Sequence, residues 1–133
     1  MLLFDCISIF PEMFAAVTDS GITPRALEEK RWQWHGWNPR DFAENAWRTI
    51  DDRPYGGGPG MVMQASPLEK AITAARSRQA ENGASHSHVI YLSPQGAPLS
   101  HQRVMELATA EGLVLLCGRY EGVDERLIER VVS

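Results

Sequence analysis

The chain has 133 residues, of which 44% are hydrophobic and 23% charged, and its formal net charge is −4. This length suits one globular domain with a buried core, and no window approaches the roughly 20 apolar residues of a membrane-spanning helix. The negative charge argues against nucleic-acid binding through bulk electrostatics, although it leaves room for a local basic patch. Cations do gather in the first half of the chain, at Arg25, Lys30, Arg31, Arg40, Arg48 and Arg53.

The N-terminal run MLLFDCISIF contains an aspartate and no basic residue, so it does not resemble a signal peptide. Cys6 and Cys117 lie far apart, each within an apolar segment. We therefore expect buried free thiols in a reduced, cytoplasmic protein, rather than a disulfide or a metal-binding pair.

The first half of the chain predicts a buried strand, two short helices and a second strand or extended edge. Residues 2–10 are rich in Leu, Ile and Phe, as in a buried strand. Pro11 opens a short helix over PEMFAAVTD, and Thr23 and Pro24 supply an N-cap and a first helical residue for RALEEKR. The alternation in WQWHGW predicts a strand or extended edge, whereas residues 38–64 show no sustained period and predict a long irregular segment.

The second half is more regular. The sequence SPLE, from Ser66, is a capping box that opens a helix running to about Ala80. After the loop ENGASHS, the run HVIYLS predicts a short apolar strand and PQGAPLS a turn. Ser100 can cap the helix HQRVMELATA, which Gly112 is expected to terminate. LVLLC is a strand of the kind buried on both faces of a parallel sheet, and RLIERVV predicts a last helix. Strands thus alternate with helices, which predicts a single α/β domain with a mostly parallel sheet and flanking helices.

Two of these strands end in unusual loops, IYLSPQG and LLCGRYEGVDE, and ligands of open α/β sheets gather at the carboxyl ends of strands. A glycine directly after a strand, such as Gly118, lets a ligand approach the main chain, while Tyr91, Leu92 and Pro94 would supply apolar walls. If the two loops lie side by side, they offer main chain to an adenosyl group. If Leu92 and Gly118 lie on opposite sides of the molecule, this interpretation fails. Ordinary turn glycines beside a solvated Arg-Tyr-Glu are the alternative.

Other familiar sites are not indicated. The sequence has neither a G-x-G-x-x-G fingerprint between a strand and a helix nor a G-x-x-x-x-G-K-[ST] phosphate loop. The four histidines show no spacing typical of a metal site, and two of them are expected in a solvated loop: His35, His101 and, in the loop, His86 and His88. The four tryptophans are expected in the core or an interface rather than as base-stacking platforms: Trp32, Trp34, Trp37 and Trp47.

Longer motifs carry a more specific signal. NPRDF (38–42), DDRPYGGGPGM (51–61), YLSPQG (91–96) and CGRYEGVDER (117–126) follow the opening ISIFPEMF (7–14) in this order. Together they resemble the bacterial tRNA (guanosine(37)-N1)-methyltransferase family over essentially the whole chain. The resemblance implies a SPOUT-class fold with a deep trefoil knot and a homodimer with its active site at the subunit interface. It also implies methyl transfer from S-adenosylmethionine to N1 of guanine 37 in the tRNA anticodon loop.

The resemblance assigns roles to individual residues. Asp51 and Arg53 resemble residues that hold the guanine and the RNA, and Glu121 resembles a carboxylate between cofactor and guanine; these three form the expected catalytic set. The expected cofactor-binding set is Tyr91, Leu92, Ser93, Pro94, Gln95, Gly96, Gly118 and Tyr120. No metal is implied.

The stretch DDRPYGGGPGM would then form a wall of the RNA site. Glycines 56–58 would let main chain pass close to an extruded nucleotide, Tyr55 could stack on a base and Arg53 could meet a phosphate. A structural Ω-loop with Tyr55 packed inward is the alternative.

The departure from the family pattern matters as well. In the family, CGRYEGVDER is followed by an Ile-Gly-Asp-Tyr…Gly-Gly-Glu segment, by the aspartate taken to be the general base, and by a helical C-terminal domain that grips tRNA. This chain stops at Ser133, before all of them. It is therefore expected to be a single N-terminal cofactor-binding domain (residues 1–133) with weak cofactor binding, and the sequence leaves open whether the knot closes. A non-catalytic dimerising or RNA-binding module is the alternative function.

Overall fold

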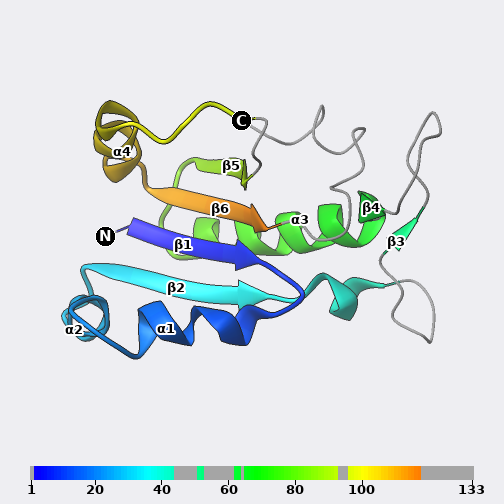
Figure 1. Ribbon diagram of the computed structural model, residues 1–133, viewed down its shortest axis with the longest axis horizontal. Coiled ribbons are helices and arrows are strands. Elements are labelled where there is room, and N and C mark those ends of the chain that lie inside the picture. Colours follow the sequence, from blue (N-terminus) through cyan, green and yellow to red (C-terminus); the bar gives the residue numbers. More distant parts are fainter. Residues whose placement is uncertain (1, 44–50, 53–61, 64, 93–95, 118–133) are drawn as a thin grey trace.

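The computed structural model describes residues 2–43, 51–52, 62–63, 65–92 and 96–117, and its centre is a four-stranded parallel sheet (Figure 1). The strand order is β2-β1-β6-β5, with β1 at Leu2–Ile7, β2 at Trp32–Trp37, β5 at Ser87–Leu92 and β6 at Gly112–Cys117. β1 pairs in parallel with both β2 and β6, and β6 pairs in parallel with β5. The predicted α/β fold with a largely parallel sheet is confirmed.

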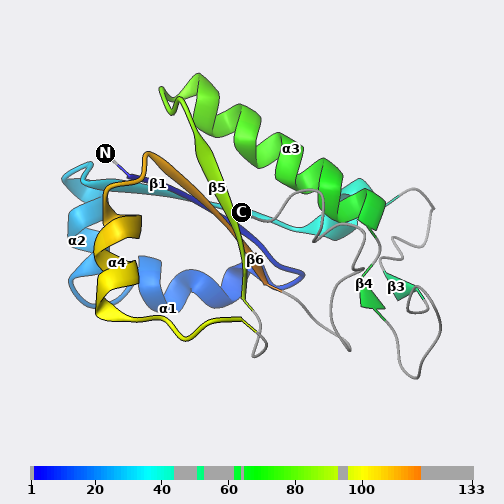
Figure 2. The same ribbon diagram turned by 90° about the horizontal axis from the view of Figure 1, so that it is seen from above.

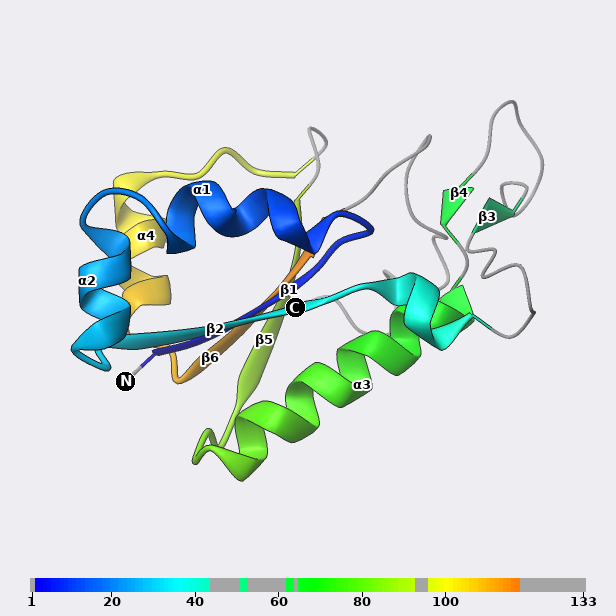
Figure 3. The ribbon, with the colours of Figure 1, turned by 90° about the horizontal axis from the view of Figure 1, so that it is seen from below.

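Helices cover both faces of the sheet. The long helix α3 (Ala65–Glu81) lies on one side, and α1 (Ala15–Thr18), α2 (Thr23–Glu28) and α4 (His101–Ala108) lie on the other (Figures 2 and 3). Two single-turn 3₁₀ helices, η1 (Pro11–Phe14) and η2 (Pro39–Phe42), follow β1 and β2. Among the described helices, none combines the length and the apolarity that a membrane crossing needs.

The hydrophobic core lies between α3 and the sheet. The helix buries Leu68, Ala71, Ile72 and Ala75, whose spacing of three and four residues places them on one helical face. Opposite them, alternate positions of the strands point to the same side and supply Ile7, Val89, Val114 and Leu116. Each large aliphatic side chain buried in this way contributes roughly 1.5–3 kcal/mol to stability.

Several local expectations are confirmed. The strands predicted at WQWHGW, HVIYLS and LVLLC are β2, β5 and β6, within one residue at each end. Ser100 is the N-cap of α4, where its side chain accepts a hydrogen bond from Arg103 N at 3.1 Å. Cys6 is buried, Cys117 is half-buried, and both are free thiols.

Other expectations are wrong at element ends. Thr23 is the first residue of α2 rather than its N-cap; its hydroxyl donates to the carbonyl of Val17, and the N-cap residue is Ile22. The helix α3 begins at Ala65, one residue before the predicted cap Ser66. Residues 38–64 are not wholly irregular, because they contain η2 and a short antiparallel pair, β3 (Asp51–Asp52) and β4 (Val62–Met63).

Gly112 was expected to end the helix before it, but α4 ends at Ala108 and Gly112 is the first residue of β6. Its lack of a side chain has a packing reason, because a Cβ there would lie 2.8 Å from Cδ of Gln79. Nε2 of Gln79 lies 3.0 Å from the carbonyl of Leu113 and 3.4 Å from that of Leu3, so this buried amide connects α3 to β6 and β1.

Candidate functional site

The loops singled out in the sequence begin at neighbouring positions. Leu92, the last residue of β5, is the direct partner of Cys117, the last residue of β6. Because the two strands are parallel, their carboxyl ends lie side by side at the same end of the sheet. The requirement that these two strand ends lie together is met; Gly118 itself lies outside the described residues.

The ends of β1 and β2 are tied together at this edge. Ser8 N donates to the carbonyl of Trp37 at 3.0 Å, and Asn38 Nδ2 donates to the carbonyl of Ile9 at 3.4 Å. Asn38 Oδ1 also accepts from Arg40 N at 3.0 Å, which caps η2. The short β3–β4 pair lies beyond this same end of the sheet (Figure 1). The four strand ends, η2 and β3–β4 therefore occupy one end of the molecule.

Three of the predicted cofactor-binding residues are described. Tyr91 is half-buried and packs against the core, which fixes the end of β5. Leu92 points to the opposite face and is 52% exposed, so it presents an apolar side chain to whatever occupies this edge. Gly96 is exposed. The other five lie outside the described residues: Ser93, Pro94, Gln95, Gly118 and Tyr120.

Of the predicted catalytic set, Asp51 lies in β3, where its backbone pairs with Met63. Arg53 and Glu121 lie outside the described residues, as do Trp47 and Tyr55. The strand β3, which contains Asp51, lies beyond the carboxyl ends of the sheet strands (Figure 1).

Neither cysteine has the features of a nucleophile at this end of the sheet. Burial raises the pKa of Cys117, which directly precedes Gly118, and it raises the pKa of Cys6 to about 12. Both thiols are therefore neutral near pH 7, whereas a cysteine nucleophile must be a thiolate.

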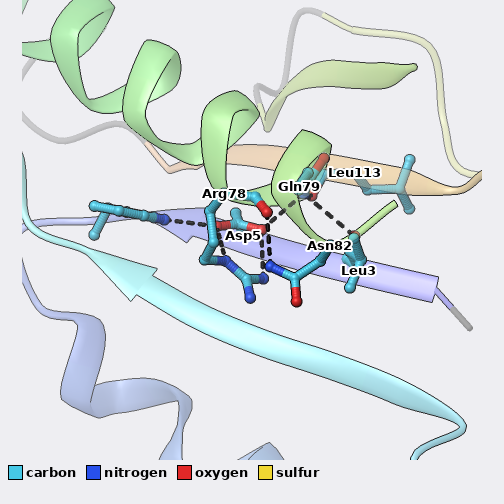
Figure 4. Close-up of polar contacts among 7 residues, drawn as sticks. Leu3, Asp5, Arg78, Gln79, Asn82 and Leu113 are labelled. Carbon is cyan, nitrogen blue, oxygen red and sulfur yellow. Dashed lines mark hydrogen bonds and ion pairs between the residues drawn. The ribbon is translucent and has the colours of Figure 1, made fainter. Parts of the chain in front are cut away.

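A buried polar cluster lies beneath α3, centred on Asp5 (Figure 4). The Asp5 side chain is fully buried and accepts four hydrogen bonds. Arg78 donates through Nε to Oδ2 at 2.8 Å and through Nη2 to Oδ1 at 2.7 Å. Gln79 Nε2 donates to Oδ1 at 2.7 Å, and Trp37 Nε1 donates to Oδ2 at 2.6 Å. With all its acceptor positions occupied and no access to solvent, this carboxylate joins α3, β1 and β2 rather than acting on a ligand.

A cavity of about 350 Å³ lies at the other end of β5 from Leu92, between this strand's start and the last turns of α3. Its lining is Arg76, Ala80, Ala84, Ser85, His86 and Ser87. Within the described ranges, no group of three or more His, Cys, Asp or Glu side chains is arranged to hold a metal ion.

Two residues important for this geometry were not singled out from the sequence. Asn38 lies in the quoted motif NPRDF, and an asparagine before proline is a signal for the cap it forms on η2. Asp5 could be noticed as a charge within an apolar strand, but its partner Arg78 lies 73 positions away, and no local pattern indicates that pairing.

Comparison with known proteins identifies similar chains. Residues 2–133 match the family model described as tRNA (Guanine-1)-methyltransferase TrmD. A tRNA (guanine-N(1)-)-methyltransferase of Dechloromonas aromatica (strain RCB) is 77% identical over 134 residues, covering 100% of this chain and 53% of that protein. The protein of the same description from Janthinobacterium sp. (strain Marseille) is 59% identical over 130 residues, covering 98% of this chain and 52% of its own length.

A solved structure shares the fold. The crystal structure of tRNA (m1G37) methyltransferase from Aquifex aeolicus matches with a TM-score of 0.79 at 35% identity, covering 98% of this chain and 56% of that one. The chain thus spans about half the length of the relatives that it matches.

Proposed function

Because the chain belongs to the tRNA (guanine-1)-methyltransferase family, we propose that it forms the cofactor-binding domain of an enzyme that methylates N1 of guanine 37 in tRNA. The observation that carries this proposal is the direct pairing of Leu92 with Cys117, which places the two strand ends that precede the family loops side by side. The m1G37 activity named for the Aquifex aeolicus structure supports the choice of nucleotide.

S-adenosylmethionine is the proposed methyl donor, and it supplies a methyl group activated by a sulfonium. The described residues suit such a ligand. The exposed side chain of Leu92 offers an apolar contact, and it lies beside the paired ends of β5 and β6. We assign Tyr91, Leu92 and Gly96 to this site together with the remaining loop residues Ser93, Pro94, Gln95, Gly118 and Tyr120. In the SPOUT class these loops form a trefoil knot, which we propose for the parent protein.

The protein must orient the guanine and accept a proton, because N1 of neutral guanine carries one. We propose that Asp51 and Glu121 orient the base and that Arg53 contacts the RNA. Holding the base in line with the methyl group can offset roughly 7–11 kcal/mol of barrier in a well-oriented reaction. In the family that this chain resembles, the general base is taken to be an aspartate that follows the matched segment.

A homodimer is the proposed assembly. The helices α1, α2 and α4 lie on one side of the sheet (Figures 2 and 3), and several large apolar side chains on these helices or next to them are exposed. They are Met13 (65% exposed), Val17 (47%), Ile22 (80%), Leu99 (71%), Val104 (43%) and Met105 (57%). Apolar side chains gathered on one face are typical of a protein–protein interface. We also propose a cytoplasmic location, where a tRNA substrate is present.

A chimera tests the function. The matched segment of the Dechloromonas aromatica relative is replaced by this chain, and the product is assayed with tRNA carrying G37 or A37. We expect 1-methylguanosine in the digested G37 tRNA and none in the A37 tRNA. In the chimera, Leu92→Asp should raise the KM for S-adenosylmethionine by about tenfold or more, because it places a charge at the apolar wall. A chimera that folds, as judged by circular dichroism, but does not methylate G37 tRNA would contradict the proposal.

The competing function is a non-catalytic dimerising or RNA-binding module. The isolated 133-residue chain separates the two through filter binding of tRNA with and without cofactor. Binding of tRNA that weakens with added salt and is the same with and without cofactor would favour the module. We expect weak cofactor binding by the isolated chain, and tight stoichiometric binding in a calorimetric titration would contradict that expectation.

A further inference from the structure

Two histidines lie together at the start of β5, away from the proposed methyl-transfer site. The strand begins at Ser87, so His86 and His88 flank its first residue and lie on the same face of the sheet. Their ring centroids are 4.4 Å apart and their planes are nearly perpendicular, at 87°. The sequence predicts both in a solvated loop, where a spacing of two residues would not place them on one face. At the start of a strand, by contrast, residues two positions apart point to the same face and can be neighbours.

This separation suits two ligands of one metal ion. Imidazole nitrogens bind such ions at about 2.0–2.1 Å, so the tetrahedral angle of zinc would place two ring centroids about 5.2 Å apart. Two rings at the 90° positions of a square-planar or octahedral ion, as for Cu²⁺ or Ni²⁺, have centroids about 4.5 Å apart. The observed 4.4 Å is close to that value. His86 is exposed and His88 half-buried, so an ion can reach the pair from solvent and keep water on its remaining positions.

A carboxylate adds negative charge beside the pair. Glu111 directly precedes Gly112, the strand partner of Ser87, and its Oε2 accepts hydrogen bonds from the Ser85 amide at 2.8 Å and from the Ser85 hydroxyl. These hydrogen bonds hold the Glu111 carboxylate on the loop that carries His86. The two histidines are therefore the protein ligands of the proposed site.

We propose that His86 and His88 form a two-histidine chelate for a divalent transition-metal ion of the imidazole-preferring class, namely Zn²⁺, Ni²⁺ or Cu²⁺. Imidazole is the protein ligand that suits these ions, whereas Mg²⁺ and Ca²⁺ prefer oxygen ligands. Binding would fix the connection between α3 and β5, because His86 lies in that connection and His88 lies in β5. The site is separate from the methyl-transfer site and supplies no group to that reaction.

Titration of the untagged 133-residue chain with Ni²⁺ tests the proposal, since Ni²⁺ does not oxidise the two thiols. We expect one ion per chain. His86→Gln and His88→Gln should each weaken binding by about tenfold or more, because each leaves a single imidazole without a chelating partner. His35→Gln and His101→Gln are matched controls that remove isolated histidines elsewhere, and they should change the affinity by less than about twofold.

A second measurement identifies the histidines that bind the ion. In ¹H–¹⁵N spectra of the histidine rings, Zn²⁺ should move or broaden the signals of two of the four histidines, and in the His88→Gln chain it should leave the His86 ring nearly unchanged. Binding that persists in the folded His86→Gln/His88→Gln chain, or that is weakened equally by the His35 and His101 substitutions, would overturn the proposal.

Discussion

Asp5 shows how a single residue can connect three elements. Its carboxylate lies in the central strand β1, and its four donors come from β2 and α3. Arg78 covers Asp5, so the Asp5 side chain is fully buried, whereas the Arg78 side chain is 18% exposed. A buried charge is tolerated only when it is paired and hydrogen-bonded, so the cluster is sensitive to loss of any one member.

Asp5→Asn should therefore destabilise the chain by about 3–5 kcal/mol, because it removes the charge that Arg78 needs and turns an amide NH₂ toward existing donors. Urea denaturation measures the change. The exposed pair Arg103–Glu106, at 3.1 Å, provides the control, since Glu106→Gln should cost less than about 1 kcal/mol. Asp5→Leu combined with Arg78→Met should cost less than Asp5→Asn. Equal costs for Asp5→Asn and Glu106→Gln would contradict the structural role given to the cluster.

Glu111 predicts a pH dependence of stability. Hydrogen bonds from Ser85 hold its pKa below the unfolded value, which means that the folded state favours the ionised form. Its contribution is complete above the unfolded pKa near 4.5 and is lost as the pH falls through the lower folded pKa. The contribution is small because the group is fully exposed.

Ser85→Ala should remove part of this contribution at pH 7, and the difference between the two chains should shrink as Glu111 becomes protonated below pH 4.5. Thermal unfolding of both chains between pH 3 and 7 measures it. A stability difference that is constant across this range would show that the Ser85–Glu111 contact is not responsible.

At the scale of elements, the strands are readily predicted from sequence and the helix ends are not. Runs such as LVLLC are apolar enough to require burial on both faces, and this property is local. Helix ends depend on competition between neighbouring groups. The Thr23 hydroxyl, for example, bonds to the Val17 carbonyl of the preceding helix instead of capping its own. Strands as short as β3 and β4, two residues each, have no detectable period.

The candidate site, too, was predictable from sequence only in part. Family motifs located both loops, but only the strand register brings Leu92 beside Cys117, and no periodicity in either strand specifies that register. The role of Gly112 was mispredicted because its reason is the Gln79 side chain, 33 positions earlier in the chain, rather than the adjacent helix.

Ser100 provides the test of a correctly predicted helix end. Its side chain satisfies the amide of Arg103 at the start of an eight-residue helix, so Ser100→Ala should cost about 1 kcal/mol, measured by urea denaturation. Ser100→Asp keeps an acceptor at the same position and should retain most of the stability. A loss of similar size in both variants would mean that packing, rather than the cap, is responsible.

At the scale of the whole molecule, the two covered faces of the sheet differ. The α3 side closes over the core, whereas the side of α1, α2 and α4 leaves Met13 and Met105 more than half exposed. The proposed homodimer uses this second side.

Replacing both methionines, Met13→Glu with Met105→Glu, should shift the chain from dimer to monomer, because two charges per protomer would be buried at the interface. Light scattering after size-exclusion chromatography measures the mass. Thr73→Glu, at an exposed position of α3, is the matched control and should leave the assembly unchanged. Dimers that persist in the double variant would exclude this face as the contact.

The order of strands also has a consequence for biosynthesis. Leu3 of β1 pairs with Gly112 of β6, so the middle of the sheet joins segments more than a hundred positions apart. A nascent chain can pair β1 with β2 soon after both leave the ribosome, but the other edge of β1 stays bare until β6 has been synthesised. During that interval Ile7 has no β6 neighbour to cover it, and long-range closure of this kind is slow and exposed to aggregation. Chaperone contact during translation would protect that edge.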